Sequence, residues 1–305
     1  MNFLEELKKI RKRIYFKTII ILLIFFVGFL IIVGNLSNVF YLIFILPLGI
    51  LFIKTIIEMF VIKDSKLYNK IYKENILLNC LKENFINVEY KLSEDDFPDG
   101  FLPEKFVEIV EDIKISGGNI FNDYISANYK NIKFEYADIE MIEEMGRYDG
   151  PSSGGNHTSF KGQWLVIETN KKIETNIQIF DKTFKGKKKD GLLSGKKYKK
   201  TKTNDIEFDN RFYIFVEKEI DISNILTPNI IKKIERIKKY LKLKLFIYFS
   251  DNRICILLEN KKDLFEPNIY KKINLEQEKN KILKQIKYIT QIIDILYLDK
   301  IYSKK

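Results

Sequence analysis

The strongest pattern in the chain is an uncharged, apolar stretch that lies between Lys17 and Lys54. A helix needs about 20 mostly apolar residues to cross a bilayer, so this stretch suits two short spans better than one. Turn-forming residues, Gly-Asn-Leu-Ser-Asn at 34–38, interrupt it. The pattern therefore predicts a transmembrane helical hairpin with helices at residues 18–33 and 39–57.

A cleaved signal peptide is the alternative, because a basic start precedes the apolar stretch. That stretch is too long for a signal peptide, no small-residue cleavage site follows it, and a second span comes at once. Basic residues flank both predicted spans, whereas the short connecting loop carries no charge. The positive-inside rule then predicts the inner (cytoplasmic) membrane of the cell, with both termini cytoplasmic.

The helical hairpin divides the chain into four parts. We expect a basic cytoplasmic N-terminus at residues 1–17, the two transmembrane helices within 18–62, a helical linker region at 63–115 and a soluble α+β domain at 116–305. Apolar spacing predicts that the chain leaves the membrane as a helix over 64–85 and that a short helix begins at Pro103.

Two further helices have clear sequence signals. Thr227 followed by Pro228 is typical of a helix start, and apolar residues then recur on one face. The chain ends in a long amphipathic helix. The predicted buried faces comprise Ile230, Ile234, Ile237 and Leu241 in the first, and Ile282, Ile286, Ile289, Ile293 and Leu296 in the second.

Alternating apolar and polar residues predict an antiparallel sheet. Around residues 132–141 the alternation shifts phase at Tyr136 and Ala137, which indicates a bulge or a break. Other predicted strands are 160–169 with 176–180 paired to it, an alternating segment at 205–217, and a hairpin of 243–249 and 254–258 closed by 250–253. Strands followed by packed helices indicate an α+β domain with an antiparallel sheet and a long C-terminal helix.

Four short motifs carry a resemblance to a known family. They are Phe160-Lys161-Gly162-Gln163-Trp164, the segment Ile-Glu-Phe-Asp-Asn-Arg-Phe at 206–212, Leu226-Thr227-Pro228, and Leu264-Phe265-Glu266-Pro267. From about Gly117 onward the chain resembles an uncharacterised bacterial two-helix membrane family of unknown function, sometimes labelled galanin-like. The chain departs from that family at 221–224. The resemblance implies the paired N-terminal helices and the order of elements, and it implies no activity.

The charge of the chain is concentrated in one segment. Net charge is +11, and residues 182–202 contain ten lysines against one acid, Asp190. Near an anionic leaflet each basic residue contributes about 1 kcal/mol of attraction. The candidate contact for anionic lipid headgroups or a protein partner comprises Lys185, Lys187, Lys188, Lys189, Lys196, Lys197, Lys199 and Lys200. A solubilising loop in a lysine-biased sequence is the alternative, and nucleic acid is disfavoured because few aromatic residues accompany the lysines.

Residues that could carry chemistry are few. The one histidine, His157, lies in a Gly/Ser-rich segment without a nucleophile motif, and a single histidine does not make a metal site. Cys80 and Cys255 are expected to be reduced and buried. Acidic residues gather at 94–96 and from Glu135 to Glu144, where a solvated strand edge is the expected reading. No catalytic, cofactor-binding or metal-binding residue is predicted.

The sequence therefore favours a membrane-anchored cytoplasmic binding or scaffold module that has no cofactor. The alternative is a membrane-tethered, hydrolase-like enzyme whose acidic site forms only in the fold.

Overall fold

A computed structural model of the chain describes residues 2–35, 42–93, 119–144, 156–183, 198–218 and 220–297. The chain divides into two compact units. The helical unit comprises Met1–Cys80 and Glu266–Ile282, and the sheet unit comprises Leu81–Phe265 and Leu283–Lys305. The helix predicted at Pro103 lies outside the described residues, as does the acidic run at 94–96.

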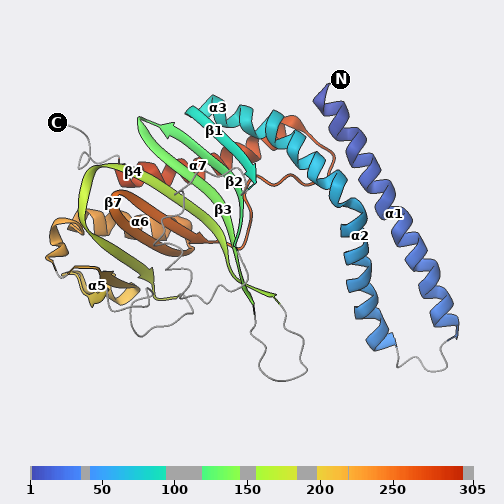
Figure 1. Cartoon of the computed structure of the whole chain (residues 1–305), viewed down its shortest axis with the longest axis horizontal. Coiled ribbons are helices and arrows are strands. Elements are labelled where there is room, and N and C mark those ends of the chain that lie inside the picture. The colour runs from blue at the N-terminus through green and yellow to red at the C-terminus, as the bar shows by residue number, and fades with distance from the viewer. Residues whose placement is uncertain are drawn as a thin grey trace. The chain divides into compact units, whose positions relative to one another are not determined.

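Two long helices dominate the helical unit and lie side by side (Figure 1). They are α1 (Phe3–Asn35) and α2 (Leu42–Tyr72), and α2 continues through a π-helical turn (Lys73–Leu77) into α3 (Leu78–Asn84). This continuity confirms the predicted helix after the second apolar segment. Among the described helices, one, Phe3–Gly34, is long and apolar enough to cross a membrane, and an 18-residue stretch of it has a mean hydropathy of 2.9.

A buried carboxylate fixes α1 against α2. Asp64 of α2 is 8% exposed and accepts a hydrogen bond of 2.7 Å from the Lys17 ammonium of α1. The Arg13 guanidinium lies 3.4 Å from the other oxygen of the same carboxylate. Because two cations of one helix converge on one anion of the other, a slide of either helix would leave a buried charge without its partner.

The described residues of the sheet unit form seven strands. These are β1 (Ile86–Ser93), β2 (Asn119–Tyr129), β3 (Ile132–Glu144), β4 (Asn156–Asp181), β5 (Lys199–Thr201), β6 (Phe212–Val216) and β7 (Lys244–Glu259). All their pairings are antiparallel. The strand order is β1-β2-β3-β4-β6-β5, and β7 also pairs with β4. The predicted α+β class with an antiparallel sheet is confirmed.

Strand β4 organises this sheet because it pairs with three others. Its residues 162–167 pair with both β3 and β7, whereas residues 177–180 pair with both β6 and β7. Strand β7 therefore pairs with both halves of β4 along one edge. On the other edge, β3 pairs with the first half of β4 and β6 with the second half. Residues 168–177 of β4 contain two register shifts relative to β7, which mark a bend between the halves.

Strands β4 and β7 are each longer than the sequence pattern predicts. Residues 160–169 and 176–180 were expected to pair with each other, and 243–249 with 254–258, but each set forms one continuous strand. Polar residues at 250–253 suggested a reversing turn, whereas they serve a bend at Asp251, whose φ of 46° is left-handed. A strand that bends strongly needs the same turn-forming residues as a hairpin.

The segment at 205–217 was expected to be one strand and is instead a helix followed by a strand. Residues Ile206–Arg211 form the short helix α5, and only Phe212–Val216 form β6. The Asp205 carboxylate caps α5 by accepting a hydrogen bond of 3.0 Å from the Phe208 backbone N–H. This cap outweighs the β-propensity of the few apolar residues before Phe212.

The other two helices were predicted correctly. Helix α6 spans Pro228–Leu241 with Thr227 as its N-cap, and α7 spans Leu275–Tyr297. Every residue predicted for their apolar faces is buried. Within the sheet unit the two helices lie behind the sheet in Figure 1, and the Lys233 ammonium of α6 donates to the Leu296 carbonyl of α7 at 2.7 Å.

Apolar side chains cover both faces of the central strands. One cluster combines Trp164 and Phe180, from the two halves of β4, with Phe246 and Leu257, from the two halves of β7. The bent β4–β7 pair thus curls around a shared core. The irregularity predicted at Tyr136 and Ala137 lies instead in the neighbouring strand: β2 advances three residues from Asn122 to Ile125 where β3 advances two, and β3 stays in register with β4 there.

Gly162 permits the close approach of β4 and β7 beside this core. A Cβ added at Gly162 would lie 1.8 Å from the Leu258 carbonyl oxygen. We expect Gly162→Ala to lower the free energy of unfolding of the sheet unit by about 3 kcal/mol, because backbone must move. The fluorescence of Trp164, the one tryptophan of the sequence, reports this unfolding.

Gly28→Ala is the matched control, since a Cβ there meets no atom within 4 Å. If Gly162→Ala unfolds at the same denaturant concentration as the wild-type protein, the described β4–β7 pairing is wrong.

Candidate functional site

The lysine-rich segment connects β4 to β5. Six of its eight candidate residues lie outside the described residues, and the other two, Lys199 and Lys200, are exposed on β5. The Lys200 ammonium lies 4.6 Å from the centre of the Tyr213 ring, and that of Lys182 lies 4.9 Å from the same ring. Tyr213 therefore holds both ends of the segment through cation–π contacts.

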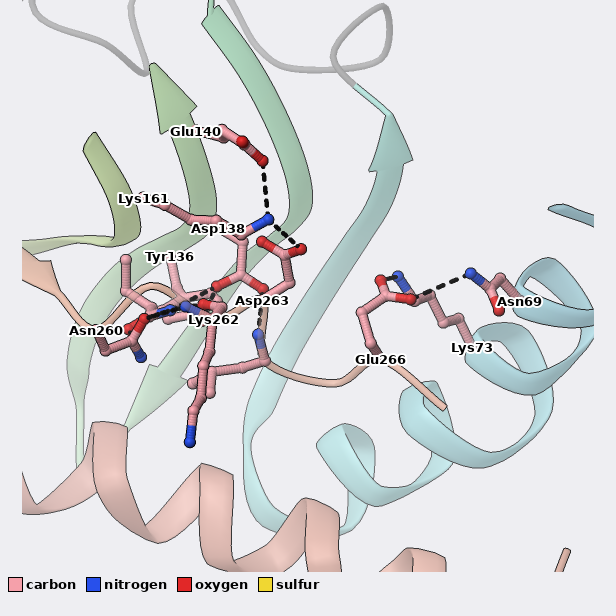
Figure 2. A network of polar contacts seen from close by, with 12 residues as sticks. Asn69, Lys73, Tyr136, Asp138, Glu140, Lys161, Asn260, Lys262, Asp263 and Glu266 are labelled. Carbon is pink, nitrogen blue, oxygen red and sulfur yellow. Dashed lines mark hydrogen bonds and ion pairs between the residues drawn. The ribbon is translucent and has the colours of Figure 1, made fainter. Parts of the chain in front are cut away.

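A buried polar network lies where β3 and β4 meet the chain that leaves β7. Its centre is Asp138, which is 1% exposed and stands opposite Gln163 in the β3–β4 register. The Tyr136 hydroxyl donates to one carboxylate oxygen at 2.7 Å, and the Gln163 amide donates to the same oxygen at 3.0 Å. The Leu264 backbone N–H donates to the other oxygen at 2.7 Å. Both oxygens of Asp138 are thus engaged (Figure 2).

Gln163 extends the network to the segment 260–264. Its side-chain amide donates to the Lys262 carbonyl at 2.8 Å and to the Asn260 side-chain oxygen at 3.1 Å. The Asn260 amide donates back to Gln163. Phe265, fully buried with a left-handed φ of 62°, follows and contacts the Tyr136 ring edge-on at 5.9 Å. The polar network and this ring contact hold a backbone conformation that a bulky residue rarely adopts.

Burial sets the electrostatics of this network. Desolvation raises the pKa of Asp138 well above its usual range, and the nearby Asp123 raises it further. The hydrogen bonds from Tyr136 and Gln163 act in the opposite direction. Desolvation, together with Asp138, also raises the pKa of the Tyr136 hydroxyl, which therefore stays protonated as a donor.

A second contact joins the same parts of the chain closer to solvent. The Lys161 ammonium lies 2.8 Å from the Glu140 carboxylate and 2.8 Å from the Asp263 carboxylate (Figure 2). Burial lowers the pKa of Lys161, but the hydrogen bonds to Asp263 and Glu140 outweigh it, and the net pKa is raised. Lys161 and Gln163, two residues apart in one motif, thus both bind the segment that follows β7. Lys161 binds Asp263 near the surface, and Gln163 binds residues 260 and 262 in the interior.

The acidic residues of β3 were expected to be a solvated strand edge, and for Asp138 this is wrong. The reason is that Asp138 meets Leu264, which lies 126 positions later in the sequence, so local alternation gave no sign of the contact. Among the acidic residues, the side chains of Glu143 and Glu144 lie outside the described set, as does that of His157. Cys80 and Cys255 are buried and reduced, as expected.

The helical unit has its own buried ion pair. Lys73 is 2% exposed, and its ammonium pairs with the Glu266 carboxylate, which also accepts a hydrogen bond of 3.1 Å from the Asn69 amide (Figure 2). The Tyr72 hydroxyl donates to the Glu278 carboxylate at 2.7 Å. These contacts bind the segment 266–282 to α2 and its π-helical turn. Glu266 belongs to the same short motif as Leu264 and Phe265.

Comparison with known proteins gives a family match and one distant structural likeness. Residues 158–298 match a family described as a protein of unknown function, DUF3137. All four motifs lie within these residues. No curated protein matches the sequence.

Among solved structures, the chain is similar to the mycobacterial trehalose monomycolate transport factor A, TtfA, at 5% sequence identity. The alignment covers 72% of this chain and 92% of that chain, with a TM-score of 0.38. A likeness at this level supports no conclusion about function.

The geometry predicts a large difference between two buried glutamines of β4. Gln163 and Gln178 are both fully buried, but neither side-chain polar atom of Gln178 has a hydrogen-bond partner among the described residues. We expect Gln163→Leu to lower the free energy of unfolding by about 2–4 kcal/mol, because Asp138, Asn260 and a backbone carbonyl lose their partner. Denaturant unfolding followed by Trp164 fluorescence measures this change.

Gln178→Leu is the matched control and should be neutral or slightly stabilising, since it replaces an unpaired buried amide by an apolar side chain. Equal losses in the two variants would show that the network around Asp138 contributes nothing specific.

Proposed function

We propose that this chain is a membrane-anchored binding or scaffold module. The proposal rests on the exposed apolar surface of α1 and α2, which such helices show when lipid surrounds them. Within the predicted span of α1 the exposed large apolar residues are Ile19, Ile20, Leu22, Leu23, Ile24, Phe26, Val27, Leu30, Ile31 and Ile32. On α2, up to residue 62, they are Leu48, Ile50, Leu51, Phe52, Met59, Phe60 and Ile62.

The anchor is a helical hairpin with spans at residues 18–33 and 39–57, both termini cytoplasmic, in the inner membrane of a bacterial cell. Phe25 of α1 contacts Phe52 of α2 edge-on at 5.8 Å, which supports pairing of the two helices within the apolar region. The Asp64 ion pairs with Lys17 and Arg13 mark the point where both helices return to a polar environment. Basic residues near this point agree with a cytoplasmic location.

The partner surface of the module is the lysine-rich segment from Lys185 to Lys200. Its described lysines are exposed, and both ends are held at Tyr213. The segment therefore presents positive charge to anionic lipid headgroups or to an acidic protein partner. Asp138 is the best buried candidate for the alternative, an acidic enzyme site, but the protein itself occupies both of its oxygens. This occupancy favours the binding role.

Single cysteines test the membrane topology. Both native cysteines are buried, and burial raises the pKa of Cys255 to about 12, so their background reactivity is low. In intact cells, a membrane-impermeant maleimide should label Ser37→Cys in the connecting loop. It should label Lys172→Cys, an exposed site of β4, only after lysis.

Labelling of Lys172→Cys in intact cells would place the sheet unit outside the cytoplasm. Labelling of Ser37→Cys only after lysis would contradict the two-span hairpin.

A further inference from the structure

A pocket of about 440 Å³ lies on the helical unit, next to the apolar part of α1. Its lining combines two basic side chains, three aromatic side chains and one aliphatic side chain. These are Arg11, Lys12, Tyr15, Phe16 and Ile19 of α1, and Tyr270 of the segment that precedes α7.

The helical period places the five α1 residues on one face. At about 100° per residue, positions 11, 12, 15, 16 and 19 fall within an arc of about 140°. The buried stripe of the same helix, Leu7, Ile10 and Ile14, borders this arc at Arg11 and lies away from Phe16. The pocket therefore begins at the edge of the packing interface of α1, and Tyr15 and Tyr270 stay about half exposed, at 51% and 52%.

The chemistry of the pocket changes along the helix axis in the order of a bilayer surface. Arg11 and Lys12 come first and Tyr15 and Phe16 follow, all of them before the predicted span that begins at residue 18. Ile19 lies at the start of that span. At about 1.5 Å per residue, the backbone of the basic pair lies about 10 Å outside the span, just beyond a headgroup layer about 5–8 Å deep. The long side chains of Arg11 and Lys12 can reach back to the phosphate groups from there. Aromatic side chains favour the next layer, the interface between headgroups and hydrocarbon.

The positive charge of the pocket is available for a ligand. Arg13 and Lys17, on the other side of α1, are engaged by Asp64. Among the described residues, no carboxylate forms an ion pair with Arg11 or Lys12. Tyr15 and Tyr270 meet edge-on at 6.5 Å and form an aromatic wall beside the two cations.

We propose that this pocket binds one anionic phospholipid of the cytoplasmic leaflet. Arg11 and Lys12 contact its phosphate, Tyr15 and Tyr270 flank its glycerol region, and Phe16 and Ile19 line the first part of an acyl chain. Bound lipid would fix the depth and the rotation of α1 in the membrane. The proposal rests on the membrane anchoring proposed above, but it concerns a site distinct from the lysine-rich segment.

The test uses the full chain in phosphatidylcholine nanodiscs that contain a small fraction of phosphatidylglycerol. Native mass spectrometry counts the phosphatidylglycerol molecules retained as that fraction is raised. We expect one tightly retained molecule per chain. The double variant Arg11→Gln/Lys12→Gln should bind it about 30-fold more weakly, since each proposed contact of a cation with the phosphate contributes at least about fivefold.

Three comparisons separate a built pocket from general charge attraction. The double variant Lys8→Gln/Lys9→Gln removes the same charge from exposed positions outside the pocket and should change retention by about fivefold at most. Tyr270→Ala should weaken retention although it changes no charge. Millimolar glycerol phosphate should not displace the lipid, because it lacks the acyl chains.

Equal effects of the two double variants, or no effect of Tyr270→Ala, would overturn the pocket. Displacement by glycerol phosphate would reassign it to a soluble phosphate. A loss caused only by Lys187→Gln/Lys188→Gln/Lys189→Gln would overturn the pocket and leave the lysine-rich segment as the lipid contact. Failure of the chain to enter nanodiscs would instead contradict the proposed membrane anchor.

Discussion

Strand β4 runs for 26 residues, and the backbone N–H and C=O groups on both of its edges need partners. Strand β7 supplies them along one edge of both halves, while β3 and β6 supply them on the other edge in turn. The bend between the halves lets Trp164 and Phe180 enter one core. The positions of β3, β6 and β7 therefore depend on β4. The close approach of Gly162 to Leu258 is part of the pairing between β4 and β7.

The motif Phe-Lys-Gly-Gln-Trp begins inside β4 and has a structural explanation for each residue. Phe160 and Trp164 enter the apolar cluster, Gly162 gives room to the Leu258 carbonyl, and Lys161 and Gln163 bind the segment that follows β7. That segment carries the second motif, Leu-Phe-Glu-Pro, whose Leu264 N–H reaches Asp138. The two motifs thus contact each other in the fold, and we call this set of contacts the clamp. The residues of both motifs have structural roles there.

The sequence predicted the helices better than the strands, and the reason is physical. Helix signals are local: Thr227 caps α6, and the apolar faces of α6 and α7 repeat at three and four residues. Strand pairing is non-local, and polar residues at 250–253 look alike whether a strand bends or reverses. The clamp around Asp138 was missed for the same reason, since its partners on β4 and after β7 lie 25 and 126 positions away. The lysine-rich segment was visible in the composition, but its two ends meet at Tyr213 only in the fold.

The helical unit joins an apolar surface to a basic and aromatic pocket, and their order along α1 matches the order of layers in a bilayer. Hydrogen–deuterium exchange of the full chain, in nanodiscs with and without phosphatidylglycerol, tests this most directly. The account predicts that the anionic lipid slows amide exchange around Tyr270, at residues 267–274, and leaves β4 unchanged. Unchanged exchange at 267–274, or a change confined to β4, would contradict a membrane-surface role for this pocket.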